Sequence, residues 1–420
     1  MVTTIGTLST NEHLGDNHSK IHPNQTEYKH KMKKTSNTIN GNDTVRYRKE
    51  ITYQLYETDT EQVVDVIDND EQLKHSTSSD QENRNVIDSN VKNVKRKYEY
   101  VWLNIIVMAS LHVAALYGLT LIPYAHRATI VWAYLLLLLG SIGVQAGAHR
   151  LWAHRTYKAN FGARLFLSLC HVVALQNDVY EWSRDHRAHH KFADTDGDPH
   201  DSTKGFFFSH VGWLLVRKHS EVKRRGKTLD MSDLERDGIV MFQRRWYIPM
   251  VALFWGLIPM AIPVLCWNEL PFNSIFICIF SRYVIALNLT WCVNSWAHMF
   301  GNRPYDKRLF AVEASIRHLL MGEGFHNYHH TFPWDYSASE LGSMDVFNPA
   351  TAVIDFFHWM GWAWDLKKVS PAMIEKRKKS TGDSVWYHKR NTSFYEWTTG
   401  TFTILSPLAF GLYLNYVLSG

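Results

Sequence analysis

Four long apolar runs limit the fold of this chain more than any other feature. They cover residues 101–122, 129–146, 248–267 and 275–297, and Arg282 is their only charged residue. Each run is close to the roughly 20 residues that an α-helix needs to cross the hydrocarbon core of a bilayer. A short connector joins the first run to the second, and another joins the third to the fourth. The sequence therefore predicts an all-α membrane protein whose four transmembrane helices form two hairpins.

The basic residues around these runs predict their orientation. The two connectors, residues 123–128 and 268–273, hold a single arginine between them. Basic residues flank the opposite ends of the runs, at 95–97, Arg150, Arg155, Arg244, Arg245, Lys307 and Arg308. Because such residues favour the cytosolic side of a membrane, we expect both connectors in the lumen. The N-terminus, residues 149–246 and the chain after residue 297 would then lie in the cytosol and form a helical cap.

The two ends of the chain differ from the membrane region. Residues 1–98 are rich in Asn, Thr, Ser and charged side chains. Such a segment buries too little apolar surface to offset its ordering entropy, so we expect a disordered tail. Residues 99–382 form the predicted membrane domain. Residues 383–420 form an extension whose apolar segment, 401–418, contains Pro407 and Asn415. That segment is either a fifth span or an anchor on the membrane surface.

Histidine clusters lie beside the apolar runs. Two clusters repeat the spacing i, i+3, i+4, at His326, His329 and His330 and at His186, His189 and His190. On a helix, three imidazoles at this spacing are expected to converge on one point. Imidazole suits iron, zinc and copper, so the clusters predict a metal site.

Three more histidines extend this set. His149 and His154 are five residues apart, which places their side chains about 140° apart on a regular helix. They must therefore lie at a helix end or bind different metals. His298 directly follows the fourth run and shares a helix face with Asn294, which is expected to contact a metal through a water or to support a ligand.

The number of histidines implies two metals. One metal takes three to six ligands, so nine imidazoles exceed what one ion uses. The four cysteines have no C-x-x-C spacing, which argues against a thiolate zinc site, and a net charge of +5 is too mild to indicate a nucleic-acid partner. At the mouth of a membrane bundle, two irons that activate oxygen fit an apolar substrate better than a two-zinc hydrolase does. A membrane metal transporter is the rival from another class, but it needs ligands deep within several spans.

Three segments resemble the histidine boxes of the membrane acyl-CoA desaturases, in the stearoyl-CoA Δ9-desaturase branch that includes insect members. They are Gly147-Ala-His-Arg-Leu-Trp-Ala-His-Arg155, Asp185-His-Arg-Ala-His-His-Lys191 and Gly322-Glu-Gly-Phe-His-Asn-Tyr-His-His330. The resemblance runs from about residue 98 to residue 382. It implies two irons held by nine histidines, with Asn294 contacting one iron through water. The ligands would be His149, His154, His186, His189, His190, His298, His326, His329 and His330.

The resemblance also implies a reaction and its partners. Members use O2 and two electrons from cytochrome b5 and its NADH-dependent reductase to remove two hydrogens from a fatty acyl-CoA, and they reside in the endoplasmic reticulum membrane. Stearoyl-CoA and palmitoyl-CoA, with a Δ9 double bond, are the expected substrates and product. A histidine-box hydroxylase, or a desaturase of another regioselectivity such as Δ11, is the alternative.

Substrate contacts are implied position by position. Residues matching those that hold the CoA head group are Asn104, Asn177, Arg184, Asp185, Arg217 and Lys218. Residues matching those that line the acyl tunnel near its bend are Gln176, Trp182, Thr290 and Trp291. Leu137 and Ser141 match the closed end of the tunnel, where relatives often carry a bulky aromatic at the first position, so Leu137 is expected to lengthen the tunnel. Leu103 stands where many relatives have arginine.

Overall fold

The structure, a computed structural model, describes residues 98–383 and 393–418, so the predicted disordered tail falls almost wholly outside it. The described residues are mostly helical. Their named strands form two short antiparallel pairs. β1 (Lys158–Ala159) pairs with β4 (Ala363–Trp364), and β2 (Gly301–Asn302) pairs with β3 (Glu313–Ala314). The all-α prediction is therefore correct in its essentials.

Within the described residues, five helical segments are long and apolar enough to cross a membrane. The first is α2 (Trp102–Thr120), which η2 (Ile122–Tyr124) follows. The second is α3 (Arg127–Ile142) with the π-helical η3 (Gly143–Ala153). The third comprises α10 (Tyr247–Val251), η6 (Ala252–Leu257) and α11 (Ile258–Trp267). The fourth comprises α12 (Pro271–Ser274), η7 (Ile275–Ser281), α13 (Arg282–Asn294) and η8 (Trp296–His298). The fifth is α17 (Ser393–Leu418).

The four expected runs coincide with the first four segments, while the fifth begins earlier than the apolar segment 401–418 suggested. The second and fourth segments are the inner ones. Of the residues in their most apolar stretches, 44% and 56% are buried, against 17% for α2 and 11% for α17. Arg282 is buried in the fourth, where its guanidinium donates to the carbonyls of Cys278 (2.7 Å) and Val173 (2.9 Å). These bonds stabilise part of a guanidinium that lipid would not solvate.

The second segment meets α4 (Phe161–Ala174) at very close range. A Cβ at Gly143 would lie 2.2 Å from the backbone nitrogen of His171, so only glycine allows η3 and α4 to approach this closely. Leu167 and Cys170 of α4 are buried, whereas Phe161 and Phe166 are exposed. α4 thus has one buried and one exposed side, and its buried side packs against the helix that carries His149.

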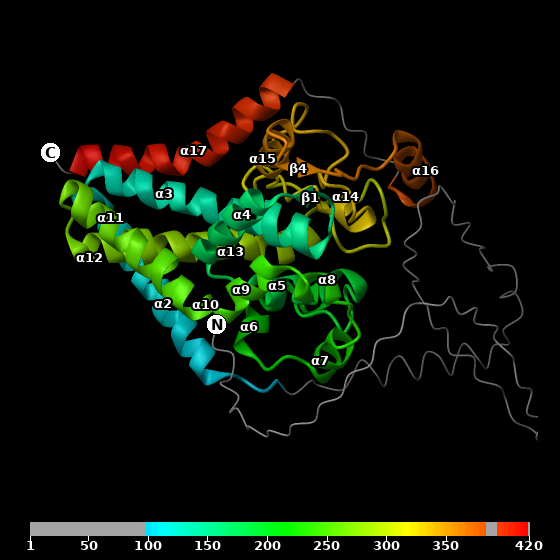
Figure 1. Cartoon of the computed structure of the whole chain (residues 1–420), viewed down its shortest axis with the longest axis horizontal. Coiled ribbons are helices and arrows are strands. Elements are labelled where there is room, and N and C mark those ends of the chain that lie inside the picture. The colour runs from blue at the N-terminus through cyan, green and yellow to red at the C-terminus, as the bar shows by residue number, and fades with distance from the viewer. Residues whose placement is uncertain (1–97, 384–392, 419–420) are drawn as a thin grey trace, which may run out of the picture. The chain divides into compact units, whose positions relative to one another are not determined.

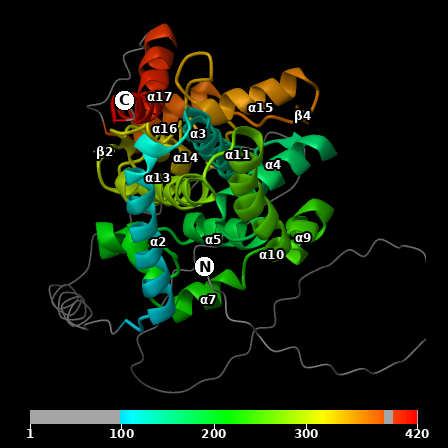
Figure 2. The ribbon, with the colours of Figure 1, turned by 90° about the vertical axis from the view of Figure 1, so that its left-hand side faces the viewer.

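Shorter helices follow the second and fourth segments and gather at one end of the long helices (Figure 1). The group between the second and third segments comprises α5 (Val179–Lys191), η4 (Ser202–Lys204), η5 (Phe208–Gly212), α6 (Trp213–Leu215), α7 (Ser220–Gly226), α8 (Ser232–Glu235) and α9 (Gly238–Arg245). The group after the fourth comprises α14 (His326–Thr331), α15 (Pro349–Trp359) and α16 (Pro371–Thr381). In both views α17 and α15 lie on one side of this unit and α7 on the other (Figure 1 and Figure 2).

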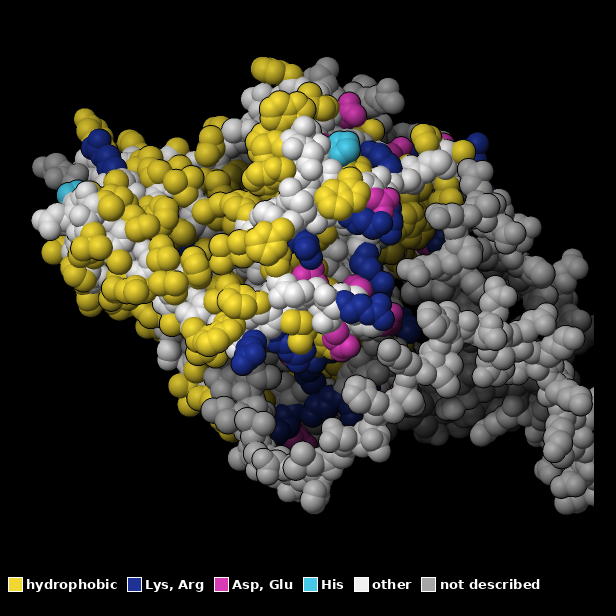
Figure 3. All heavy atoms as spheres, viewed as in Figure 1, with side chains coloured by type: hydrophobic (Ala, Val, Ile, Leu, Met, Phe, Trp, Pro, Cys, Tyr) yellow, Lys and Arg dark blue, Asp and Glu magenta, His cyan; other side chains and the backbone are white. Residues whose placement is uncertain are grey.

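The exterior of the long helices is apolar. Figure 3 shows hydrophobic side chains covering the part of the surface over the long helices, while lysine, arginine and acidic side chains gather over the short ones. Trp102, Ile106, Val113 and Leu265 are among the most exposed apolar residues. Exposing this much apolar surface to water is unfavourable in free energy, whereas contact with lipid tails is not. The helices therefore associate with a membrane.

Candidate metal centre

The nine histidines lie in two groups at the end of the long helices. The first group comprises His149, His154, His186, His190 and His329, and the second comprises His189, His298, His326 and His330. Within each group the ligand atoms all lie within 4.8 Å of one another. The structure therefore brings together every histidine that the sequence singled out and divides them between two sites, as the count of imidazoles suggested.

The expectation that each i, i+3, i+4 triplet converges on one point is wrong. On α5, His186 and His190 belong to the first group and His189 to the second, whereas on α14 His326 and His330 belong to the second and His329 to the first. Relative to residue i, residue i+4 lies about 40° to one side of the helix and residue i+3 about 60° to the other. Each triplet therefore straddles both groups, and the two helices contribute to them in opposite proportions.

The first group is tightly packed around His329. Its Nε2 lies 2.9 Å from Nε2 of His149 and 3.0 Å from Nε2 of His190, and the same atoms of His154 and His186 are 2.8 Å apart. His149 is in η3, and His154 directly follows the end of that helix, where its backbone N–H donates to the carbonyl of His149. The pair therefore lies at a helix end, as the first alternative expected, and both rings belong to one group.

The second group is arranged around His326. Its Nε2 lies 3.1 Å from Nε2 of His298 and 3.0 Å from Nε2 of His330, and His189 approaches His330 to 3.3 Å. His298 comes from η8, directly beyond α13, so the fourth membrane segment delivers one ligand to this group.

The electrostatics of both groups suit a bound cation. Burial and then the neighbouring imidazoles hold the pKa of His154, His190 and His329 well below its usual value, so these rings are neutral. Glu323 lies against Nδ1 of His149 and Asp198 lies against Nδ1 of His189, which leaves Nε2 of each ring facing its group. Converging lone pairs repel one another unless a cation lies between them. A cluster of neutral imidazoles is a donor set for a divalent transition metal.

Glu323 and Arg150 orient the first group. Arg150 was expected only as a basic residue flanking a membrane run, and Glu323 was not singled out by the sequence. Oε2 of Glu323 lies 3.1 Å from Nδ1 of His149, and Oε1 accepts from Arg150 at 2.7 Å. Arg150 is fully buried and also donates to Thr351 Oγ1 at 2.7 Å. Burial raises the pKa of Glu323, but Arg150 and His149 lower it by more, so the carboxyl stays ionised. The signal was present, because both residues lie inside the histidine motifs.

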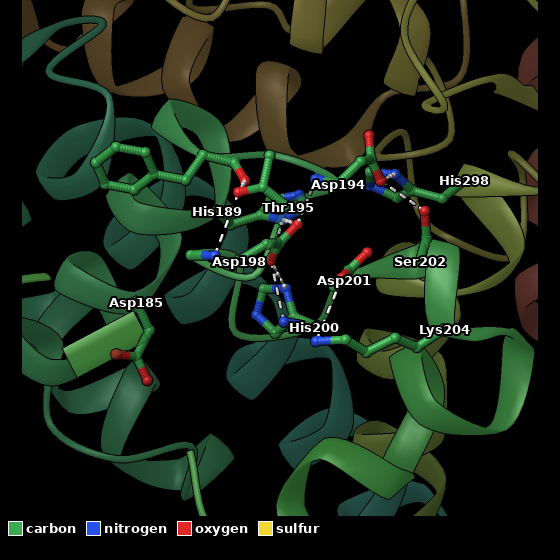
Figure 4. A network of polar contacts seen from close by, with 12 residues as sticks. Asp185, His189, Asp194, Thr195, Asp198, His200, Asp201, Ser202, Lys204 and His298 are labelled. Atoms are coloured by element: carbon green, nitrogen blue, oxygen red, sulfur yellow. Dashed lines mark hydrogen bonds and ion pairs between the residues drawn. The ribbon is translucent and has the colours of Figure 1, made fainter. Parts of the chain in front are cut away.

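Asp198 orients a histidine of the second group, as Glu323 does in the first (Figure 4). Both its carboxylate oxygens lie 2.9 Å from Nδ1 of His189. The backbone N–H groups of Asp194 and His200 donate to this carboxylate and fix its position. A partner of this kind sets the tautomer and the ring orientation of a metal-ligating histidine. The acid-rich stretch Asp194-Thr-Asp-Gly-Asp198 directly after the second motif was the available signal.

Two cavities meet beside the histidines. Residues that line both are Trp182, His186, Thr290 and Asn294. The first cavity also touches Ser141, Gln145, Leu320 and Met321, and the second touches Gln176, Asn177, Asp185 and Trp291. All four residues expected near the bend of a tunnel therefore line these cavities. Asn294 faces a space that His149 and His326, from different groups, also border.

Of the residues expected to hold the CoA head group, some line the second cavity and others lie outside it. Asp185 lines the second cavity and forms ion pairs with Lys218 and with Arg184 (3.2 Å). Asn104 donates to the carbonyl of Leu214, a residue of the second cavity, and Arg217 is exposed and pairs with Glu99 at 3.2 Å.

At the expected tunnel end, only one of the two residues is in place. Ser141 lines the first cavity, whereas Leu137 lines neither, although its carbonyl accepts from Ser141 Oγ at 2.9 Å. Gln145, Leu320 and Met321 complete the wall there and were not foreseen. Leu103, where relatives were expected to carry arginine, is exposed on α2.

The chain combines helices long and apolar enough to cross a membrane with two groups of histidines that could hold metal ions, beside two cavities. These features are those of a candidate membrane-bound metalloenzyme. A sequence model of the fatty acid desaturase family matches residues 128–344, which contain all nine histidines. This chain belongs to the fatty acid desaturase family, and it is an oxidoreductase of lipid metabolism.

Three relatives illustrate the match. Stearoyl-CoA desaturase of Sus scrofa is 56% identical over 288 residues, which cover 68% of this chain and 80% of the relative. Acyl-CoA Delta-9 desaturase of Acheta domesticus is 53% identical over 293 residues, covering 69% and 81%. Stearoyl-CoA desaturase of Homo sapiens is 54% identical over 288 residues, covering 68% and 80%.

Proposed function

We propose that this protein introduces a Δ9 double bond into saturated acyl-CoA, with stearoyl-CoA and palmitoyl-CoA as substrates. The observation that carries the proposal is the pair of cavities that meet at Trp182 and Thr290, beside both histidine groups. An acyl chain lying through them has one stretch of carbons next to the metal ligands, while the rest is held by apolar walls. The names of the relatives from Sus scrofa and Acheta domesticus point to the same substrate class.

Two irons are the metals that this function requires. The first group would hold one iron with five histidines, and the second would hold the other with four histidines and Asn294 through a water. When bound, the irons supply the oxidising power that removes two hydrogens with O2, using electrons from cytochrome b5 and its NADH-dependent reductase. The chain positions the acyl carbons, excludes water and keeps the ligands neutral and oriented.

We assign the thioester end of the substrate to the second cavity. Asp185 and Asn177 line it, and Arg184 and Lys218 are ion-paired to Asp185. Together with Asn104 and Arg217, these residues would hold the CoA head group, because guanidinium and ammonium groups suit its phosphates. The methyl end then lies in the first cavity, against Ser141, Leu320 and Met321.

The proposal has a direct test in desaturase-deficient yeast that express the full chain. Mass spectrometry of the fatty acids is expected to show monounsaturated C16 and C18 products with the double bond at Δ9. Hydroxylated products would support the hydroxylase alternative, and a bond at Δ11 would support the other regioselectivity. Absence of any modified acyl chain, in cells that contain folded protein, would contradict the proposal.

We also propose an endoplasmic reticulum topology in which two hairpins, α2 to α3 and α11 to α12, turn in the lumen and the histidine groups face the cytosol. α17 then crosses as a fifth span and takes the C-terminus to the lumen. An Asn-X-Ser/Thr acceptor on a spacer after Gly420 is expected to be glycosylated, and the same acceptor placed beside Lys227 to remain unmodified. The reverse pattern would contradict this topology.

A further inference from the structure

α17 lies beyond the part of the chain that the family model matches, which ends at residue 344. It packs along α3 and η2 (Figure 1). Its outward face is apolar and exposed, with Phe394, Phe402 and Phe410 all more than half accessible. A helix that only anchored the chain would need nothing more than this face. The inward face of α17 instead carries polar side chains that bind the rest of the protein.

Asn415 holds the C-terminal end of α17 in place. Its side-chain amide donates to the carbonyls of Ile122 (2.9 Å), Pro123 (3.2 Å) and Ala125 (2.8 Å), in the connector after α2. Midway along the helix, the hydroxyl of Tyr134 on α3 donates to the carbonyl of Ile404 at 2.7 Å. These bonds set the position of α17 along α3.

The N-terminal end of α17 carries a buried carboxylate. Glu396 is 2% exposed, accepts from Arg317 at 2.6 Å and lies 3.0 Å from Nε2 of His318. Burying a carboxylate is costly unless charged or polar partners meet it, so Glu396 and Arg317 must stay together. The helix is thereby attached to the segment that precedes the third histidine motif.

That segment is the wall of the first cavity. Leu319, Leu320, Met321 and Glu323 all line it, directly after the two residues that Glu396 holds. Met321 has a φ of 54°, a left-handed conformation that costs a non-glycine residue free energy and persists only where surrounding contacts impose it. The backbone N–H groups of Met321 and Gly322 donate to the carbonyls of His318 (3.1 Å) and Arg317 (3.4 Å), so the two residues that Glu396 binds also hold this turn.

A second contact supports the same wall. A Cβ at Gly400 of α17 would lie 2.1 Å from Phe347, and the rings of Phe347 and Trp397 are 5.0 Å apart. Phe347 directly precedes Asn348, whose side-chain oxygen accepts from Arg150, the partner of Glu323. α17 therefore supports the cavity wall from two directions.

We propose that Glu396 is a positioning residue that holds residues 319–323 against the methyl end of the acyl chain, and thereby sets the preferred chain length. The inference rests on the proposed desaturase function. When the wall is released, the first cavity deepens, and longer chains gain relative to shorter ones. A difference of one or two methylene groups in an apolar pocket is enough to change selectivity severalfold.

The test uses the full chain in desaturase-deficient yeast, with the ratio of C18 to C16 monounsaturated product as the readout. Glu396→Gln is expected to raise this ratio by about threefold or more. Arg317→Met is expected to raise it similarly, and the double variant to add little, because both changes break one contact. Phe402→Ala, on the lipid-facing side of α17, is the matched control and should leave the ratio unchanged.

The outcomes separate the two proposals. No unsaturated product from the unchanged chain overturns the desaturase function itself. If the unchanged chain is active and Glu396→Gln leaves the ratio of C18 to C16 product unaltered, the positioning role alone is overturned. This holds whether or not total activity falls. If Glu396→Gln does not accumulate, Arg317→Lys keeps the positive charge but loses the guanidinium that donates to Glu396. An unaltered ratio in that variant overturns the positioning role equally.

Discussion

Replacing His329 with alanine is expected to abolish desaturation, with a loss of more than about 100-fold in product per folded protein. His329 Nε2 lies within 3.0 Å of the same atom in both His149 and His190, so it stands at the centre of the first group. Changing the partner of a metal ligand typically costs 10- to 100-fold, and removing a ligand costs more. The measurement is product formation by microsomes supplied with labelled stearoyl-CoA, NADH and O2.

His126→Ala is the matched control for this loss. His126 is exposed beside α3, at the opposite end of the second membrane segment from His149. Its substitution is expected to leave product formation unchanged. Activity of His329→Ala within a few fold of the unchanged chain would contradict the assignment of this histidine as a ligand.

Replacing Arg150 with methionine is expected to lower the free energy of unfolding by about 3–5 kcal/mol. Methionine keeps much of the side-chain volume but leaves Glu323 buried without its guanidinium partner, and Thr351 loses its 2.7 Å hydrogen bond. Denaturant unfolding of the purified protein in detergent gives the change. Because Glu323 also orients His149, metal content should fall together with stability.

An exposed ion pair provides the comparison for Arg150. Arg224 donates to Glu221 at 2.7 Å, the same length as the contact between Arg150 and Glu323, but its side chain is 65% accessible. Arg224→Met should leave the free energy of unfolding nearly unchanged, because solvent screens such pairs. Equal destabilisation by the two substitutions would show that burial does not strengthen the Arg150 contact.

The membrane segments and the nine histidines could be predicted because each leaves a local signal in the sequence. Bilayer thickness imposes a minimum length on an apolar run, and four runs coincide with helical segments in the structure. The histidine spacing identified residues that the structure brings together, but it did not predict their division between two groups. That division depends on how α5 and α14 face each other, which spacing within one helix does not encode.

Tertiary contacts account for what the sequence did not predict. Asp198 reaches His189 across a turn, and Glu323 meets Arg150 across 173 positions of chain. Leu137 was assigned to the tunnel end by resemblance, but it lines neither cavity, whereas Ser141, four residues further along the same helix, lines the first. The start of α17 at Ser393 was missed because residues 393–400 are too polar to read as part of an apolar span.

The most direct test of the two-site account is the iron content of the purified full chain, measured together with its zinc and copper content. Two histidine groups that each hold one ion predict about two irons per chain, falling to about one or less in His329→Ala. One iron per unchanged chain, or zinc in place of iron, would contradict the account.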